Sequence, residues 1–297
     1  MTEALCWLNG VLMPAAQARL PVLDHGLLYG DGVFEGIRFY NGRAFRLSRH
    51  LERLRRSAAA IRLTLPGDAG SFDAAVHDTI AAYGRPEGYL RLIVTRGAGK
   101  LGLDPGSCGE PNLIIIADEL ALVSEAVRNE GARVIVAATR RLGADGLDPR
   151  IKSLNYLNHI LARLEAVNAG ADEAILLNAA GHVTEGTADN VFLVRHGKLL
   201  TPPASDGALE GVTREVILEL AQELGIERVE TTLGPYDLHT ADECFLTGTG
   251  AELIPVREVD GRPLAVCPGP VFSVLLAAFR RQVNRETAAP QLVARRQ

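Results

Sequence analysis

Short runs of alternating apolar and polar residues, separated by turn sequences, dominate the first part of the chain. Two of the turns are the pairs Asn9-Gly10 and Asn41-Gly42, which suit the two-residue loop of a β-hairpin. Apolar residues then recur at helical spacing in two segments that begin near Ser48 and Ser71. Strands are expected at 88–95 and 112–117. This order of elements predicts an α+β unit with an antiparallel sheet, because hairpins join antiparallel neighbours.

The pattern loosens after residue 119, and a polar stretch at 124–131 separates the first unit from a second one. In the second unit we expect strands at 134–138, 174–177, 191–194, 199–200 and 244–247, helices at 155–168, 213–224 and from about 270, a hairpin around Asp260-Gly261, and a frayed tail at 286–297. We therefore divide the chain into a small N-terminal domain over 1–120, a linker over 121–131 and a larger domain over 132–297.

Composition is that of an ordinary globular protein. The chain has 297 residues, of which 47% are hydrophobic, and its 31 basic and 36 acidic side chains give a net charge of −5. No apolar run approaches the about 20 residues of a membrane helix, and the N-terminus lacks a secretory signal, so we expect a cytoplasmic protein. The mild acidity predicts no nucleic-acid or membrane partner. Neither the four scattered cysteines nor the histidines have the spacing of metal ligands, so no metal is expected.

A glycine-rich segment at 97–102 fits the pattern G-x-G-x-x-G and follows an apolar strand. A dinucleotide site needs a helix to begin at those glycines, so that its N-terminus meets the pyrophosphate. Here the next residues are Leu103-Asp104-Pro105-Gly106, which stop a helix. The segment is better interpreted as a glycine-rich loop over a pocket, and a nicotinamide-dependent dehydrogenase is disfavoured.

Lysine is scarce, which narrows the search for an amine nucleophile. The sequence contains only Lys100, Lys152 and Lys198. Lys198 is expected in a solvated hairpin turn and Lys100 in the glycine-rich loop. Lys152 instead lies between a Gly/Pro-rich loop and the start of an apolar-striped helix. The N-terminus of a helix disfavours a positive charge, so it favours the neutral form of the amine, which is the form that reacts as a nucleophile.

Two strands each combine an aromatic residue with an arginine. In the first, Phe34, Gly36 and Arg38 share one face, while Glu35 takes the other. A glycine inside a strand weakens it unless another group must approach closely. Tyr89 and Arg91 share a face of the second strand. These faces describe a slot for a small apolar acid; the alternative is a hairpin with solvent-facing arginines.

Further segments offer a carboxylate and two anion-binding cups. Glu185 ends a turn before an apolar strand, which places its carboxylate at a strand edge. The segments 211–213 and 248–250 each provide glycine amides and a threonine hydroxyl, at the start of a helix and after a strand respectively. A lysine, a carboxylate and a phosphate cup are the groups that pyridoxal 5'-phosphate (PLP) needs.

Taken together, these motifs resemble those of a known family, the fold-type IV PLP-dependent aminotransferases. The matching segments are Tyr29-Gly30-Asp31-Gly32-Val33-Phe34-Glu35-Gly36-Ile37-Arg38, His50-Leu51-Glu52-Arg53-Leu54, Lys152-Ser153-Leu154-Asn155-Tyr156, Thr184-Glu185-Gly186 and Thr247-Gly248-Thr249-Gly250-Ala251-Glu252. Within this family the chain looks most like branched-chain amino acid aminotransferases. The resemblance implies a two-domain α+β fold like that of D-amino acid aminotransferase, in which the larger C-terminal domain is a pseudo-barrel.

The resemblance also implies a role for each residue. Lys152 would hold the cofactor covalently and move a proton between the substrate α-carbon and the cofactor C4′. The other cofactor residues would be Arg53, Val212, Thr213 and Thr249 at the phosphate, Glu185 at the pyridine nitrogen, Tyr156 at the phenolic oxygen and Leu209 on the ring. The substrate pocket would comprise Tyr29, Phe34, Gly36, Arg38, Tyr89, Arg91 and Gly250. Arg53 lies off the apolar stripe of its helix, which by itself predicts a solvated charge.

The implied activity is transamination of L-leucine, L-isoleucine and L-valine with 2-oxoglutarate by alternating half-reactions, in a homodimer whose subunits share pocket residues near Tyr29 and the 97–108 loop. A D-amino acid or (R)-amine transaminase, an aminodeoxychorismate lyase and a non-catalytic binding protein are the alternatives. The chain departs from the family pattern in three places: the loop at 120–124 lacks aromatic residues, 187–190 reads Thr-Ala-Asp-Asn where Ser-Gly-Glu-Asn is common, and Gly250 replaces a frequent alanine.

Overall fold

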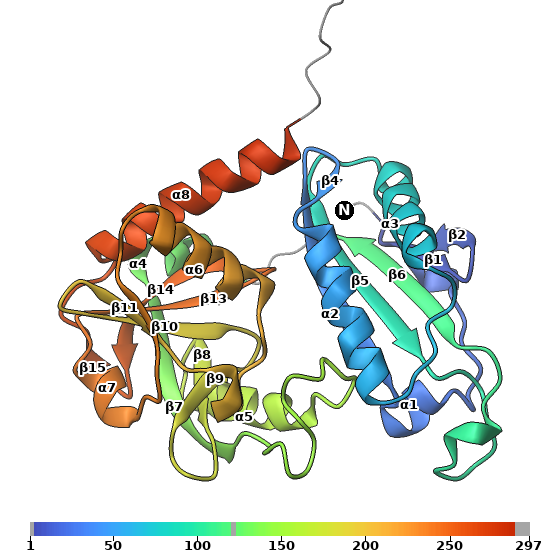
Figure 1. Ribbon diagram of the computed structural model, residues 1–297, viewed down its shortest axis with the longest axis horizontal. Helices are drawn as coiled ribbons and strands as arrows, with labels where there is room; N and C mark the ends of the chain where they lie inside the picture. Colours follow the sequence, from blue (N-terminus) through green and yellow to red (C-terminus); the bar gives the residue numbers. More distant parts are fainter. Residues whose placement is uncertain (1–2, 120–122, 289–297) are drawn as a thin grey trace, which may run out of the picture.

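An antiparallel sheet of six strands forms the N-terminal part of the chain in a computed structural model, which describes residues 3–119 and 123–288 (Figure 1). The strands are β1 (Leu5–Leu8), β2 (Val11–Pro14), β3 (Gly32–Tyr40), β4 (Arg43–Ala44), β5 (Gly88–Thr95) and β6 (Asn112–Asp118), in the order β2-β1-β6-β5-β3-β4. Every pairing in this sheet is antiparallel, and both Asn-Gly hairpins form as predicted.

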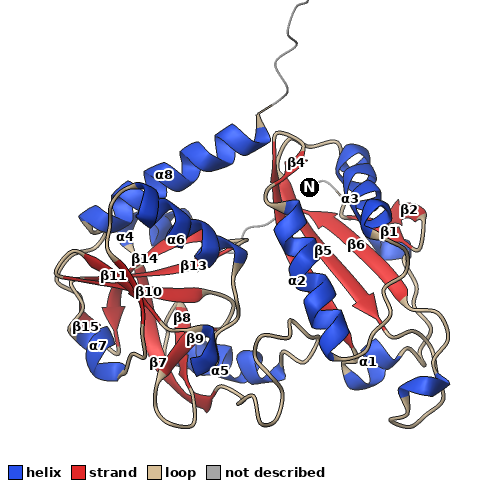
Figure 2. Ribbon diagram, viewed as in Figure 1, coloured by secondary structure: helices blue, strands red, loops and turns tan. Residues whose placement is uncertain are grey.

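Helices α2 (Leu47–Ala60) and α3 (Ala69–Tyr83) cover one face of this sheet (Figure 2). Their apolar stripes pack on the odd-numbered residues of β3, such as Ile37, and on Leu90 and Leu92 of β5. Because successive side chains of a strand point to opposite faces, Phe34 and Gly36 are left facing away from the helices. The alternation along β3 therefore separates a helix-covered face from a face that is free to build a pocket.

The second sheet has nine strands and is mixed. Its strands are β7 (Ala132–Arg140), β8 (Glu173–Leu177), β9 (Val183–Gly186), β10 (Asn190–Arg195), β11 (Lys198–Thr201), β12 (Arg228–Glu230), β13 (Glu243–Gly248), β14 (Glu252–Val259) and β15 (Arg262–Pro263). The path runs β12-β11-β10-β13-β14-β7-β8-β9, with β15 on β14. A link of only three residues, 187–189, joins β9 at the end of this path to β10 near its other end, so the sheet curls.

Helices α6 (Val212–Glu223) and α8 (Pro270–Thr287) cover the outside of the curled sheet, over a core that includes Phe192, Phe245 and Phe279. Phe45, which follows β4, packs in the same core and ties the two sheets together. The remaining helices are α1 (His25–Tyr29), α4 (Glu125–Glu130), α5 (Leu157–Asn168) and α7 (Pro235–His239). Within the described residues, each helix is too short or too polar to span a bilayer.

The sequence-based prediction lacks α1, α7 and β12, and three further segments differ from it. The region of Glu185 is a strand, β9, rather than a turn; all four of its residues are buried, so they show no two-residue alternation. Residues 125–130 of the predicted linker form α4, which begins at a Ser124 cap, while residues 120–122 lie outside the described part. The tail predicted to fray from 286 stays helical to Thr287, because that side chain is fully buried. The domain boundaries drawn from the sequence stay a prediction.

Candidate active site

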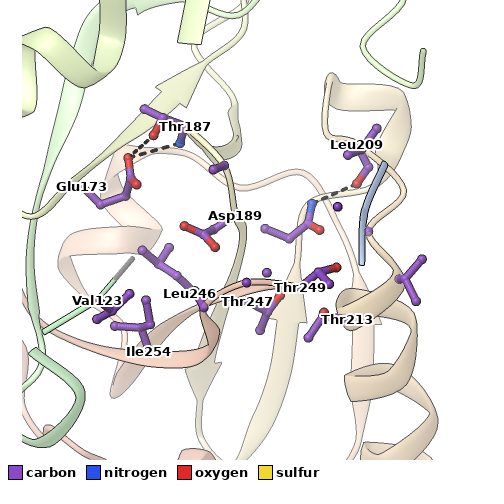
Figure 3. Close-up of a pocket in the computed structure, with 18 of the residues that line it drawn as sticks. Val123, Glu173, Thr187, Asp189, Leu209, Thr213, Leu246, Thr247, Thr249 and Ile254 are labelled. Atoms are coloured by element: carbon purple, nitrogen blue, oxygen red, sulfur yellow. Dashed lines mark hydrogen bonds between the residues drawn. The ribbon is translucent and has the colours of Figure 1, made fainter. Parts of the chain in front are cut away.

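A cavity of about 590 Å³ lies where the free face of β3 and β5 meets the curled sheet. It gathers most of the residues selected from the sequence, which come from distant segments: Phe34, Gly36, Arg53, Tyr89, Arg91, Lys152, Tyr156, Leu209, Val212, Thr213, Thr249 and Gly250. In Figure 3, Asp189 lies between two groups of lining residues: Leu209, Thr213, Thr247 and Thr249 lie to its right or below it, and Thr187 and Glu173 lie above it and to its left.

Lys152 is half-buried in the cavity, and its backbone is fixed on both sides. Its carbonyl accepts a hydrogen bond from the Phe34 amide at 3.0 Å, and its own amide donates to Ser57 Oγ at 3.0 Å. The side-chain Nζ lies 3.0 Å from Tyr156 Oη and 4.4 Å from the centre of the Phe34 ring. Lys198 is instead paired with Glu227 at the surface. Of the three lysines, all within the described residues, Lys152 alone lines the cavity.

The aromatic and arginine residues of β3 and β5 form one wall. A Cβ added at Gly36 would collide with the hydroxyl of Tyr89, which explains why the strand carries glycine there. The Arg91 guanidinium lies 4.6 Å from the centre of the Phe34 ring. This wall therefore combines an apolar surface with a cation, as the slot predicted from the sequence requires.

Glu185 lies behind the lining residues and is held as a carboxylate. Its Oε1 accepts from Arg141 Nε at 2.8 Å and lies 3.5 Å from His159 Nε2, and its Oε2 accepts from the Leu209 amide at 2.8 Å. Burial opposes this charge, yet the hydrogen bond of His159, the charge of Arg141 and the Leu209 amide together hold the pKa of Glu185 below its usual value.

His159 and Arg141 were not identified as site residues from the sequence, in which the histidines show no spacing of metal ligands. His159 is buried, and its ring stacks on Tyr156 at 4.4 Å between centres, so it connects the partner of Lys152 to Glu185. The spacing of Tyr156 and His159, three residues apart at the start of a helix, is the signal that could have revealed this pair.

Helix α6 begins at the cavity with groups that suit an anion. Its N-cap is Gly211, which offers no side-chain cap, so the first-turn amides depend on another acceptor. A Cβ at Gly211 or at Gly248 would collide with the side chain of Asn190 or Asp189, respectively. Thr247 Oγ1, beside this cup, is buried with no hydrogen-bond partner among the described residues. These features fit a phosphate group.

Arg53 corrects the expectation of a solvated charge. It is only 5% exposed, because α2 turns it toward β3 and the cavity. Its Nε and Nη2 donate to Glu35 at 2.7 and 2.8 Å, and its Nη1 donates to the Glu210 carbonyl at 2.8 Å. Helical spacing could not show this contact, because the partner lies on a strand.

Two predicted substrate residues lie outside the cavity lining of this chain. Tyr29 Oη accepts from the Gly102 amide at 2.9 Å, and Arg38 Nη1 donates to the Gly250 carbonyl at 3.1 Å. The glycine-rich loop expected over the pocket does not line the cavity either. It packs on α1 instead, where the Lys100 carbonyl lies 3.0 Å from His25 Nε2. The substrate roles of Tyr29 and Arg38 stay predictions.

A family model described as amino-transferase class IV matches residues 32–259. The chain belongs to the class IV aminotransferases. A Methanocaldococcus jannaschii protein, provisionally named a branched-chain-amino-acid aminotransferase, is 48% identical to this aminotransferase over 257 residues, which are 86% of this chain and 88% of the relative. The fold-type IV architecture predicted from the sequence is thereby confirmed.

Solved structures extend the likeness to three dimensions. The branched-chain aminotransferase of Thermoproteus uzoniensis, solved with norvaline, has a TM-score of 0.89 and 38% identity, and the match covers 96% of each chain. The branched-chain amino acid aminotransferase of Thermobaculum terrenum, solved in its PLP form, has a TM-score of 0.86 and 31% identity, over 95% of each chain. The structural neighbours of this aminotransferase thus include one solved with a vitamin B6 cofactor and one solved with an amino acid that has an unbranched apolar side chain.

Proposed function

We propose that this chain transfers the amino group of L-leucine, L-isoleucine and L-valine to 2-oxoglutarate with PLP as its cofactor. The observation that carries the proposal is the place of Lys152 Nζ, in one cavity with the anion cup of α6 and the aromatic and arginine wall of β3 and β5. The names of the relatives and structural neighbours support the same activity and do not favour the alternatives.

The chain has groups that fit each part of the cofactor. The α6 cup, with Val212 and Thr213, would hold the phosphate together with Arg53 and Thr249, and Leu209 would pack on the ring. Tyr156 would donate to the phenolic oxygen, and Glu185 would meet the pyridine nitrogen. When bound, PLP supplies an aldehyde for the amino group and a ring that accepts electrons from the α-carbon.

The residues around the cofactor site hold protons at defined atoms. Because Arg141, His159 and the Leu209 amide keep Glu185 ionised, its carboxylate favours a proton on a ring nitrogen placed against it. Lys152 Nζ can carry a proton to and from a carbon held in the cavity, since its backbone is fixed by Phe34 and Ser57. Tyr156 Oη, 3.0 Å away, orients that amine.

The wall opposite the cup would select the substrate. An apolar side chain would pack on Phe34, and the Arg91 cation, 4.6 Å from that ring, would attract the second carboxylate of 2-oxoglutarate. The amides of Thr249 and Gly250 would receive the α-carboxylate that both substrates share. Arg38 would act on this subsite from outside the lining, since its Nη1 binds the Gly250 carbonyl.

A substrate panel tests the proposal. The purified enzyme is given 2-oxoglutarate with L-leucine, L-isoleucine, L-valine, D-alanine or (R)-1-phenylethylamine, and glutamate is measured. We expect the L-branched-chain amino acids to have the highest kcat/KM. Faster turnover of D-alanine or of the (R)-amine would replace the proposed activity by its nearest alternative, and no glutamate from any donor would favour a non-catalytic binding protein.

We also propose that the chain acts as a homodimer. Five apolar side chains of α5 are 47–67% exposed: Leu157, Ile160, Leu161, Leu164 and Val167. Exposed apolar faces of this kind are typical of surfaces that associate. The cytoplasmic location expected from the sequence stays a prediction.

A further inference from the structure

Strand β3 buries a carboxylate on the face opposite the cavity. Glu35 is fully buried, while its neighbours Phe34 and Gly36 line the cavity from the other face. Both Glu35 oxygens are used: Oε1 accepts from Arg53 Nε at 2.7 Å, and Oε2 accepts from Arg53 Nη2 at 2.8 Å and lies 2.7 Å from His50 Nδ1. The proposed function gives Glu35 no role.

The contacts of Arg53 fix its guanidinium from two directions. Glu35 holds the Nε and Nη2 edge in a two-pronged pair, and the Glu210 carbonyl, just before the α6 cup, holds Nη1 at 2.8 Å. Arginine has five N–H donors, so one donor on Nη1 and one on Nη2 remain for a ligand. Because Arg53 lines the cavity, those two donors are the ones that can reach an anion in the cup.

Such a buried pair is a poor source of stability by itself. Removing two charges from water costs free energy that their attraction only partly offsets, so apolar residues often replace such pairs without loss. Burial opposes the charge on Glu35, yet the charge of Arg53 and the hydrogen bonds of Arg53 and His50 hold the pKa of its carboxyl well below the usual range. Burial lowers the pKa of His50, which favours a neutral ring that donates from Nδ1 to the carboxylate.

We propose that Glu35 is a positioning residue that sets the orientation of Arg53 and so makes the site selective for a phosphate monoester. The inference rests on the proposed function, because it assigns the phosphate of the cofactor to the cup. His50 supports the same orientation by holding the Glu35 oxygen that faces Nη2. One face of strand β3 thus forms the substrate wall, and the other face, through Glu35, positions the arginine that would bind the phosphate.

The experiment compares PLP with pyridoxal, which has the same aldehyde but no phosphate. Dissociation constants of both are measured for the full-length wild type and for Glu35→Gln after cofactor removal, from the change in visible absorption on titration. We expect Glu35→Gln to weaken PLP binding by about tenfold or more, since an ionic two-pronged pair is lost. Pyridoxal binding should change by less than about twofold, because that ligand does not use Arg53.

A matched control and a double variant separate positioning from general damage. Glu52→Gln removes a carboxylate from α2, the helix that carries Arg53, but Glu52 is exposed and pairs with Arg49 at 3.1 Å. This variant should keep the wild-type preference for PLP. In an Arg53→Leu background, adding Glu35→Gln should leave the PLP-to-pyridoxal ratio unchanged, because Glu35 acts through Arg53. A further fall in the ratio would contradict the proposed route.

Glu35→Asp covers the case in which Glu35→Gln does not fold. Aspartate keeps the charge but is one methylene shorter, so the guanidinium should move and the PLP-to-pyridoxal ratio should still fall. An unchanged ratio in every folded Glu35 variant, or equal weakening of both ligands, would overturn the inference. A wild type that binds neither ligand would instead refute the proposed function, so the two failures can be told apart.

Discussion

Gly36 has a direct steric role in the candidate site, because the Tyr89 hydroxyl occupies the space of its missing side chain. Gly36→Ala should displace Tyr89 and raise the KM for L-leucine by about tenfold, the effect of losing roughly one good contact. Cofactor absorption should be unchanged. Gly70→Ala is the control: its Cβ would approach no atom closer than 3.6 Å, so steady-state kinetics should not change. Equal effects of the two substitutions would contradict the assignment.

Asp189 makes the stability of the cofactor-free protein depend on pH. Burial and the nearby Glu173 charge raise the pKa of its carboxyl from 3.8 to about 7. The folded state therefore keeps a proton that the unfolded state has lost, so Asp189 destabilises the fold increasingly as the pH rises from about 4 to 7. Asp189→Asn removes this effect. Its gain in thermal midpoint over the wild type should be larger at pH 8 than at pH 4, as thermal unfolding would show. A gain that is independent of pH would count against the raised pKa of Asp189.

At the residue scale, the sequence predicts a role where the type and position of a residue are informative by themselves. Lys152 could be selected because lysine is scarce, and Gly36 because glycine is unfavourable inside a strand. Glu35, Arg53 and His159 could not be interpreted in this way. Each acquires its role from a partner on another element, and one sequence carries no signal for a contact between residues that are far apart along the chain.

At the scale of elements, β3 supports the turn between β13 and β14 as well as the cavity. Tyr40 Oη donates to Glu252 at 2.7 Å, and Glu252 has a positive φ of 63°, so its backbone needs support. Tyr40→Phe should lower the free energy of unfolding by about 1 kcal/mol. It should also raise the KM of L-leucine and of 2-oxoglutarate together, because the amides of this turn would receive the carboxylate that both substrates share.

Denaturant unfolding and two-substrate kinetics check this prediction. A change confined to one substrate would mean that the turn does not serve the common carboxylate. Phe45, whose ring packs on Phe279 in the core between the sheets, offers a contrast. Phe45→Leu should lower stability by leaving core volume unfilled while changing neither KM.

The elements themselves were well predicted where a local rule applied. The two hairpins follow from Asn-Gly pairs, and α2, α5 and α6 follow from apolar spacing. Strand β9 was not predicted because it is buried on both faces, and α4 was not predicted because a short polar helix resembles a linker in sequence. The curl of the second sheet depends on parallel pairings such as β7 with β8, which join segments that are far apart in sequence.

At the scale of the whole molecule, the exposed apolar face of α5 predicts association. Leu161→Glu combined with Leu164→Glu should convert the proposed homodimer into monomers, because charges would be buried in an apolar interface. Light scattering coupled to size exclusion measures the mass. Val274→Glu is the control, since Val274 is 47% exposed on α8, away from that face. A double variant with the same mass as the wild type would place the interface elsewhere.

The candidate site is a product of the complete fold. Its parts come from β3, α2, the segment before α5, the link between β9 and β10, and the start of α6. The sequence could supply the list of parts, largely through the family resemblance. It could not supply Arg141 and His159 behind Glu185, because these contacts depend on how the second sheet closes.

The proposed chemistry depends above all on Lys152 as the carrier of the cofactor, and chemical trapping can show this. The purified enzyme is incubated with PLP, treated with borohydride to make any bond between lysine and aldehyde permanent, digested, and analysed by peptide mass spectrometry. With only three lysines in the chain, the assignment has few alternatives. We predict the added mass on the peptide that contains Lys152 and on no other. Label on Lys100 or Lys198, or no label at all, would contradict this role of Lys152.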